Sequence, residues 1–178
     1  MRTPLTPLAF PPQGRPGAPG LNTGFGQVTY TERSVEADDS FAAGVRQQVR
    51  FVPTPSLTQD LLNAPFAGHT FWSDNRLIGR AMGDLIDVTV NLIVTATIAG
   101  GQLRTDADVG STLGPVASDS QTLFNGAGIP ERTTFRLRLQ VLAGFLANGC
   151  ALFLTSNVPL LVTSETVLVA PASIRPAA

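Results

Sequence analysis

The stretch Ile86-Asp-Val-Thr-Val-Asn-Leu-Ile-Val-Thr-Ala-Thr-Ile98 decides the fold class. Apolar residues occupy every second position from Ile86 to Ile98, and Asp87, Thr89 and Asn91 lie between them. Because successive side chains of a strand point to opposite faces, this period of two predicts a long, half-buried β-strand. A helix would instead repeat its apolar positions every three or four residues.

Shorter runs that read as strands lie on both sides of this stretch, at residues 28–31, 48–51, 102–106, 135–141, 151–154, 158–162 and 166–169. Turn formers separate them, and Asn148-Gly149 is typical of a two-residue hairpin. Only Ser56–Gln59 resembles a helix start. The pattern predicts an all-β, antiparallel jelly-roll sandwich of about eight strands over residues 25–178, with a long excursion at about 53–84.

Residues 1–24 differ from the rest, because they contain six prolines and four glycines. Such a segment cannot form a helix or a central strand, so we expect an extended N-terminal arm. At about 3.1 Å per residue it could reach on the order of 75 Å. Either it is a free tail or a neighbouring subunit holds it, and the second reading predicts apolar anchor residues, namely Leu5, Leu8, Phe10 and Phe25.

The composition excludes several classes of chemistry. The 12 basic residues are all arginines, which excludes a P-loop and a Schiff-base enzyme. One histidine and one cysteine exclude disulfide scaffolds and Cys/His zinc sites. A net charge of −1 predicts no nucleic-acid partner. The uncharged segment 139–164 is broken by turn formers, so it predicts strands and no membrane span.

Two groups of residues could carry chemistry, and each also has a structural reading. His69, with Ser73 and Asp74 nearby in sequence, could act as a base, but a packed histidine is the preferred interpretation. Asp106 and Asp108 precede a glycine and could bind calcium, but aspartates at strand ends usually cap turns.

Carboxylates at Asp38-Asp39 and at Asp84 and Asp87 could supply a glycosidase pair. With one Trp and one Tyr, the chain lacks the aromatic platforms that sugar sites usually add. We therefore expect no enzyme, no cofactor and no bound metal.

Arginines and aromatic residues are candidates for protein contacts. Arg46, Arg50, Arg136 and Arg138 lie on polar strand faces, either solvated or in contact with an acidic partner surface. The aromatic residues Phe66, Phe71 and Trp72 could cover one end of the sandwich or contact a partner. Leu152 and Leu154 lie in a run that is apolar on both faces, which predicts a central strand or a subunit contact. The predicted protein interface comprises Phe66, Phe71, Trp72, Arg136, Arg138, Leu152 and Leu154.

The sequence resembles the decoration, or cement, proteins of tailed-phage capsids. The resemblance lies in the Pro/Gly arm before a charge-poor β domain. It extends along Gly114-Pro115, Leu123, Ile129-Pro130-Glu131 and Phe135, then through residues 145–159 to Val167-Leu-Val169. It covers about two thirds of the chain and rests on composition and the order of residues, with no short diagnostic motif.

This resemblance implies a structural virion protein on the capsid exterior that binds the major capsid protein and stabilises contacts between capsomers. It also implies a homotrimer and no catalytic residues. Short jelly rolls occur in head fibres and tail knobs as well, so a receptor-binding module is the alternative. An enzyme that uses a carboxylate pair is the third hypothesis.

Overall fold

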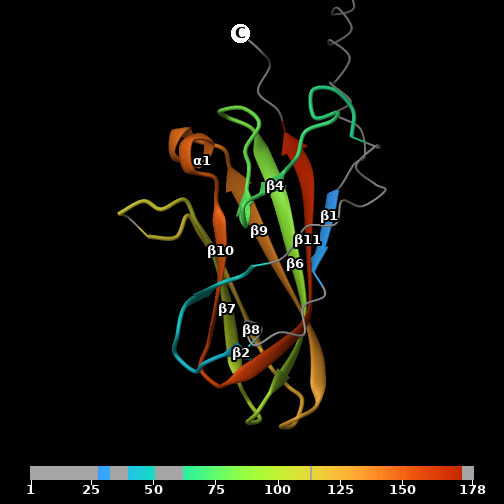
Figure 1. Cartoon of the computed structure of the whole chain (residues 1–178), viewed down its shortest axis with the longest axis vertical. Helices are drawn as coiled ribbons and strands as arrows, with labels where there is room; N and C mark the ends of the chain where they lie inside the picture. Colours follow the sequence, from blue (N-terminus) through green and yellow to red (C-terminus); the bar gives the residue numbers. More distant parts are fainter. Residues whose placement is uncertain (1–27, 33–39, 51–61, 113, 174–178) are drawn as a thin grey trace, which may run out of the picture.

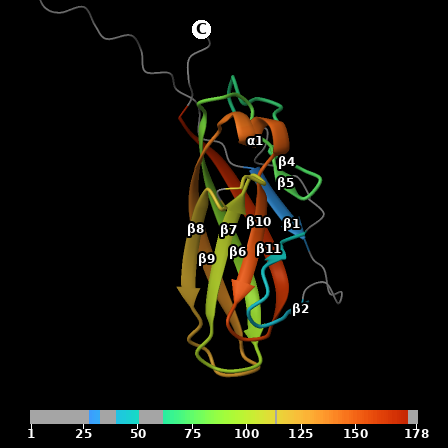
Figure 2. The ribbon, with the colours of Figure 1, turned by 90° about the vertical axis from the view of Figure 1, so that its left-hand side faces the viewer.

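The computed structural model describes residues 28–32, 40–50, 62–112 and 114–173. The predicted arm with its anchors Leu5, Leu8, Phe10 and Phe25, and the helix start at Ser56–Gln59, lie outside the described residues. The described part forms two antiparallel sheets packed face to face, as Figures 1 and 2 show from two sides.

The first sheet is built around β6 (Leu85–Ala96), the strand predicted from its period of two. It pairs with β9 (Pro130–Gln140) on one side and with β11 (Leu160–Ser173) on the other. The strand β1 (Val28–Glu32) pairs with the far side of β11, so the order is β1-β11-β6-β9. The short β2 (Ser40–Phe41) pairs with the start of β11.

The second sheet has the order β3-β10-β7-β8. Its strands are β3 (Gln47–Gln48), β10 (Ala151–Ser156), β7 (Gln102–Asp108) and β8 (Ala117–Thr122). Counted along the chain without the short β2 and the hairpin strands β4 and β5, the two orders read 1-8-3-6 and 2-7-4-5. This is the strand order of a jelly roll, so the predicted fold is confirmed.

The core lies between the two sheets, and the alternation of β6 sets its position. Side chains of β6 alternate between buried and partly exposed along the whole strand. The buried set packs with the inward-facing residues of the opposite sheet, such as Leu103 and Leu152. Each fully buried side chain of this size contributes about 1.5–3 kcal/mol, so the period of two accounts for much of the stability of the fold.

The excursion between β3 and β6 contains a small hairpin, β4 (Trp72–Ser73) and β5 (Arg76–Leu77). Its two-residue turn, Asp74 and Asn75, has positive φ at both positions, as a type I′ turn requires. Leu77 forms an isolated bridge with Cys150, at the start of β10. The excursion is therefore attached to the second sheet.

Two local predictions were wrong. Asn148-Gly149 does not form a hairpin turn, because Asn148 ends the short helix α1 (Ala143–Asn148) and Gly149 follows it. The segments 158–162 and 166–169 are not separate strands, because residues 160–173 form β11, with an irregularity between Val162 and Ser164. In the described part of the chain, no helix has the length and apolar character needed to cross a bilayer.

Gly149 holds a backbone conformation that its neighbours and its dihedral angles both restrict to glycine. Its φ of 66° and ψ of −175° lie in a region that only glycine occupies readily. A Cβ added there would lie 2.9 Å from the carbonyl oxygen of Leu77. Gly149 is thus required where α1 meets the Leu77–Cys150 bridge.

We predict that Gly149→Ala lowers the free energy of unfolding by about 1–3 kcal/mol, through backbone strain and the contact with Leu77. Chemical denaturation measures the change. Gly110→Ala is the matched control, because Gly110 has a φ of 72° but open space around the added Cβ. An equal loss in both variants would show that the contact with Leu77 contributes nothing.

Candidate functional site

His69 serves as a packing group. Its Nε2 lies 3.2 Å from the carbonyl oxygen of Ile78, and its ring meets the edge of Phe71 with centroids 4.6 Å apart. The hydroxyl of Ser73, which lies near His69 in sequence, donates to Asp74 at 3.2 Å. These contacts agree with the packed histidine that the sequence favoured over a catalytic base.

Asp106 and Asp108 lie on the second sheet in contact with arginines. Arg46 donates to Asp108 at 2.8 Å and to Asp106 at 3.4 Å, while Nε of Arg104 donates to Asp106 at 2.7 Å. The guanidinium of Arg46 also lies 3.7 Å from the ring centre of Phe153. We call Arg46, Arg104, Asp106 and Asp108 the Arg46 cluster. It neutralises both carboxylates and fastens the segment before β3 to the sheet.

The second pair of candidate carboxylates is divided between two separate arginines. Arg80 donates to both oxygens of the buried Asp84, at 2.9 and 2.8 Å. Arg138 on β9 donates to both oxygens of Asp87 on β6, at 2.7 and 2.9 Å. The hydrogen bond from Arg138 lowers the pKa of Asp87 against the opposing effect of burial. Asp38 and Asp39 lie outside the described residues.

Five of the predicted interface residues belong to the core of this chain. Phe66, Phe71, Trp72, Leu152 and Leu154 are all at most 1% exposed. Their apolar surface is already covered by the sandwich and by the excursion that packs on it. As placed here, they therefore offer no surface to a subunit or a capsid.

The two predicted arginines of the interface do lie on the surface. Arg136 and Arg138 are exposed on the outer face of the first sheet, where Arg138 pairs with Asp87. The backbone N–H of Arg136 donates to Asp119 at 2.9 Å, which ties the edge of β9 to β8. This face keeps an exposed guanidinium at Arg136.

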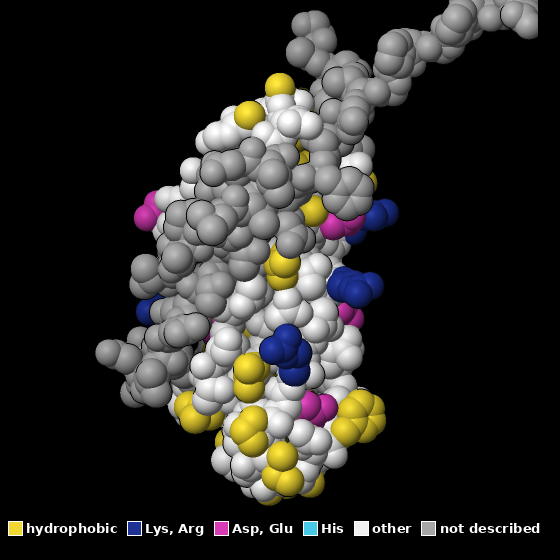
Figure 3. Space-filling view, turned by 90° about the vertical axis from the view of Figure 1, so that its right-hand side faces the viewer, with side chains coloured by type: hydrophobic (Ala, Val, Ile, Leu, Met, Phe, Trp, Pro, Cys, Tyr) yellow, Lys and Arg dark blue, Asp and Glu magenta, His cyan; other side chains and the backbone are white. Residues whose placement is uncertain are grey.

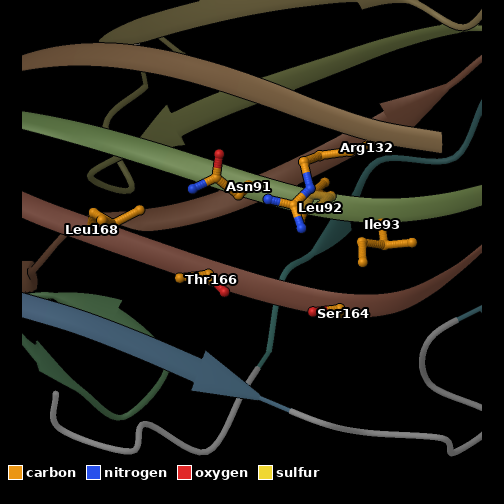
Figure 4. A pocket seen from close by; sticks show the side chains of 7 residues that line it. All are labelled: Asn91, Leu92, Ile93, Arg132, Ser164, Thr166 and Leu168. Carbon is orange, nitrogen blue, oxygen red and sulfur yellow. The ribbon is translucent and has the colours of Figure 1, made fainter.

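The same face carries a hollow of about 210 Å³ beside Arg132 (Figure 4). Thr134 donates to the side-chain oxygen of Asn91 at 2.8 Å, so the amide nitrogen of Asn91 stays available as a donor. Hydroxyl groups of Ser164 and Thr166 add polar atoms, and Leu168 adds an apolar wall. The hollow is smaller than the roughly 300–1,000 Å³ of sites for drug-sized ligands. It fits one small polar unit.

Several large apolar side chains outside the predicted interface are exposed on the surface. Phe124, between β8 and β9, is 85% exposed. A signal was present, because Phe124 begins the loop Phe-Asn-Gly-Ala-Gly-Ile129, where a large aromatic residue stands among turn formers. A side chain in such a loop lies outside the two sheets, so no neighbouring strand covers it.

No model of a known protein family matches the chain, and no curated protein matches its sequence. Solved structures share its fold. The PRD1 vertex protein P5 matches with a TM-score of 0.50 at 14% identity, covering 83% of this chain and 73% of that chain. The Eiger TNF from S. frugiperda gives 0.49 at 13%, covering 87% and 98%. The globular domain of zebrafish complement 1qA gives 0.46 at 12%, covering 85% and 100%. At these identities the likeness to the vertex protein supports the jelly-roll arrangement alone.

The Arg46 cluster makes the stability dependent on pH. Burial acts to raise the pKa of Asp108, but the N–H of Gly110 and the guanidinium of Arg46 outweigh it and hold the pKa below the ordinary 3.8. A carboxyl whose pKa falls on folding stabilises the protein above its unfolded pKa. That stabilisation is lost as the pH falls through the folded pKa.

We predict that Asp108→Asn lowers the free energy of unfolding at pH 7 and makes it less dependent on pH below about pH 4. Denaturant titrations from about pH 7 to pH 2.5 measure both effects. In an Arg46→Gln background the effect of Asp108→Asn should shrink, because the partner is already missing. An undiminished effect in that background would assign the stabilisation to Gly110 instead.

Proposed function

We propose that this chain is a structural virion protein that decorates the outer surface of a phage-like head and stabilises contacts between capsomers. The observation that carries the proposal is the jelly-roll fold, for which the PRD1 vertex protein P5 matches 83% of this chain with a TM-score of 0.50. The resemblance of the sequence to capsid decoration proteins supports the same role. The proposed partners are the major capsid protein and two further copies of this chain.

The use of charge in the described residues supports a structural role. Asp84, Asp87, Asp106 and Asp108 each accept hydrogen bonds from an arginine of the same chain. Arg46 joins the segment before β3 to β7, Arg138 joins β9 to β6, and the Arg80–Asp84 and Arg104–Asp106 pairs are local. Catalytic carboxylates need a free face toward a substrate, whereas these four are engaged by arginines of the same chain.

The proposed mechanism is burial of surface across the joints of the shell. The sandwich would supply a rigid body, and residues 1–24 would extend over adjacent capsomers. Ordering an extended segment costs about 1–2 kcal/mol per residue, so it needs apolar anchors at intervals. We assign that role to Leu5, Leu8, Phe10 and Phe25.

The polar hollow beside Arg132 favours a second candidate, a head-fibre or tail-knob protein that binds a receptor. Its donors Arg132 and Asn91, with two hydroxyl groups, suit a small glycan unit. The two functions differ in copy number. A decoration protein covers the shell, whereas a fibre or knob is present in a few copies.

We predict that quantitative mass spectrometry of purified native particles finds this chain in a simple ratio to the major shell protein, near one or a fraction that matches every threefold position. A handful of copies per particle would favour the receptor-binding alternative. Absence from the particles would reject both virion roles.

We predict that deletion of residues 1–24 leaves a folded domain that binds shells more weakly. Circular dichroism and thermal unfolding check the fold of the truncated chain, and co-sedimentation with shells measures binding. Replacement of Leu5, Leu8 and Phe10 together by serine is the matched variant, since it keeps the length of the arm. Unchanged binding by the truncated chain would reject the role of the arm.

A further inference from the structure

One end of the sandwich is built from loops without charge. The connections at residues 97–101, 123–129 and 157–159 contain no Asp, Glu, Arg or His. They lie at the lower end in Figure 1, opposite α1. Three large apolar side chains on them are exposed: Ile98 by 57%, Phe124 by 85% and Ile129 by 55%. Figure 3 shows hydrophobic side chains gathered at this end, which we call the uncharged end.

The loops of the uncharged end are fixed to one another. Hydrogen bonds link all three loops to the strands and to each other. The N–H of Gly128 donates to the carbonyl of Ala96 at 2.8 Å, and the N–H of Leu123 donates to the carbonyl of Gly101 at 2.7 Å. The N–H of Thr97 donates to the carbonyl of Pro159 at 3.0 Å, and the N–H of Gln102 donates to Oδ1 of Asn157 at 2.6 Å. Gly101 is packed so closely that an added Cβ would lie 2.5 Å from Val158. The end is therefore a preformed surface.

The backbone of Phe124 is fixed at the start of its loop by a hydrogen bond to the carboxylate of Glu131. One oxygen of Glu131 accepts the backbone N–H groups of Phe124 at 2.8 Å and of Asn125 at 2.9 Å. The side-chain amide of Asn125 donates to the carbonyl of Pro130 at 2.9 Å. The turn is thus ordered before any partner arrives. Binding through the ring of Phe124 would then cost little additional conformational entropy.

We propose that the uncharged end docks on the shell through Phe124, which enters an apolar pocket free of charged residues on a shell protein. The inference deepens the proposed function and rests on it. The loops carry no charge of their own, and the neighbouring carboxylate of Glu131 already accepts the N–H groups of Phe124 and Asn125. They therefore match an uncharged pocket, because a charged group on the partner would lose its hydration there and meet no opposite charge from these loops. An aromatic side chain on a rigid turn is the kind of residue that dominates binding energy at such contacts.

The absence of arginine from these loops weighs against a membrane, whereas a second copy is an alternative that the test decides. A bilayer surface usually attracts a basic residue to its headgroups, and these loops contain no arginine. A second copy would have to offer a pocket for the ring. The hollow beside Arg132 is lined by Leu92, Ile93 and Leu168 as well as by Asn91, Ser164 and Thr166. A second copy is therefore tested directly, by the sedimentation measurement below.

The test uses shells prepared without this chain and the full chain added back. We expect Phe124→Asp to weaken binding by about 30-fold or more and Phe124→Leu to weaken it less. Leu142→Asp is the matched control, because Leu142 is 54% exposed and precedes α1 at the opposite end. It should bind like the wild type, and thermal unfolding should show that all three variants fold.

Each other outcome overturns the inference in its own way. Wild-type binding that Phe124→Asp does not change rejects this docking surface and leaves the decoration role standing. Failure of the wild type to bind shells rejects both. Equal loss of shell binding in Phe124→Asp and Leu142→Asp shows that the introduced charge, and not the missing phenyl ring, weakens binding. Phe124-dependent binding to phosphatidylcholine vesicles assigns the end to a membrane. A Phe124-dependent change in oligomeric state, measured by sedimentation, assigns it to a second copy.

If Phe124→Asp fails to fold, Ile129→Asp replaces it. Ile129 lies on the same loop and is 55% exposed. Its effect on shell binding, compared again with Leu142→Asp, then decides the inference by the same criteria.

Discussion

The pairing of β6 on both of its edges is the constraint on which the rest of the structure depends. β9 and β11 are both antiparallel to it along almost its full length. A slip of one residue in either register would move the whole apolar set of β6 from the core to the outer face. The registers therefore also fix which side chains meet outside the core. Asp87 faces Arg138, and Asn91 faces Thr134.

The ion pairs differ in what they contribute, although each joins an arginine to an aspartate. Arg138 and Asp87 are 66% and 43% exposed, and a pair this exposed to solvent contributes about 0–1 kcal/mol. Asp84 is fully buried, so removal of Arg80 would leave a charge without compensation in the interior. The guanidinium suits both positions, because its planar fork binds two carboxylate oxygens at once. The exposed pair links β6 to β9, while the buried pair braces the turn of chain that leads from the excursion into β6.

The sequence predicted the fold wherever local pattern and tertiary environment agree. β6 and β9 are half-buried, so their alternation is visible in the sequence. The apolar run at residues 151–154 is a central strand between β3 and β7, which is one of the two readings that its sequence allowed. The prediction of a hairpin turn at Asn148-Gly149 was wrong because glycine permits a positive φ both in hairpin turns and after helices. Nothing local distinguishes the two contexts.

Contacts between distant residues decide between the readings that the sequence left open for the candidate residues. Phe66 and Trp72 are aromatic residues in a segment without strand pattern, and such residues can equally cover a core or bind a partner. The ion pairs of Asp106 and Asp108 with Arg46 span about 60 residues, and no spacing rule predicts them. Phe124 was missed for a related reason, since exposure of a large side chain depends on what the rest of the chain leaves uncovered.

The jelly roll separates the two candidate binding surfaces, the hollow beside Arg132 and the uncharged end. This separation affects which substitutions each surface tolerates without loss of strand register. The hollow beside Arg132 is made by strand residues, so its donors are tied to the β6–β9 register through the bond between Thr134 and Asn91. The uncharged end is made by connections, whose side chains lie outside the ladders. Substitutions at Phe124 therefore change a contact without changing the register, whereas substitutions around Asn91 risk both. A sandwich that must keep one core can vary most freely at its loops, and the exposed apolar side chains of this chain between β6 and β7 and between β8 and β9 lie there.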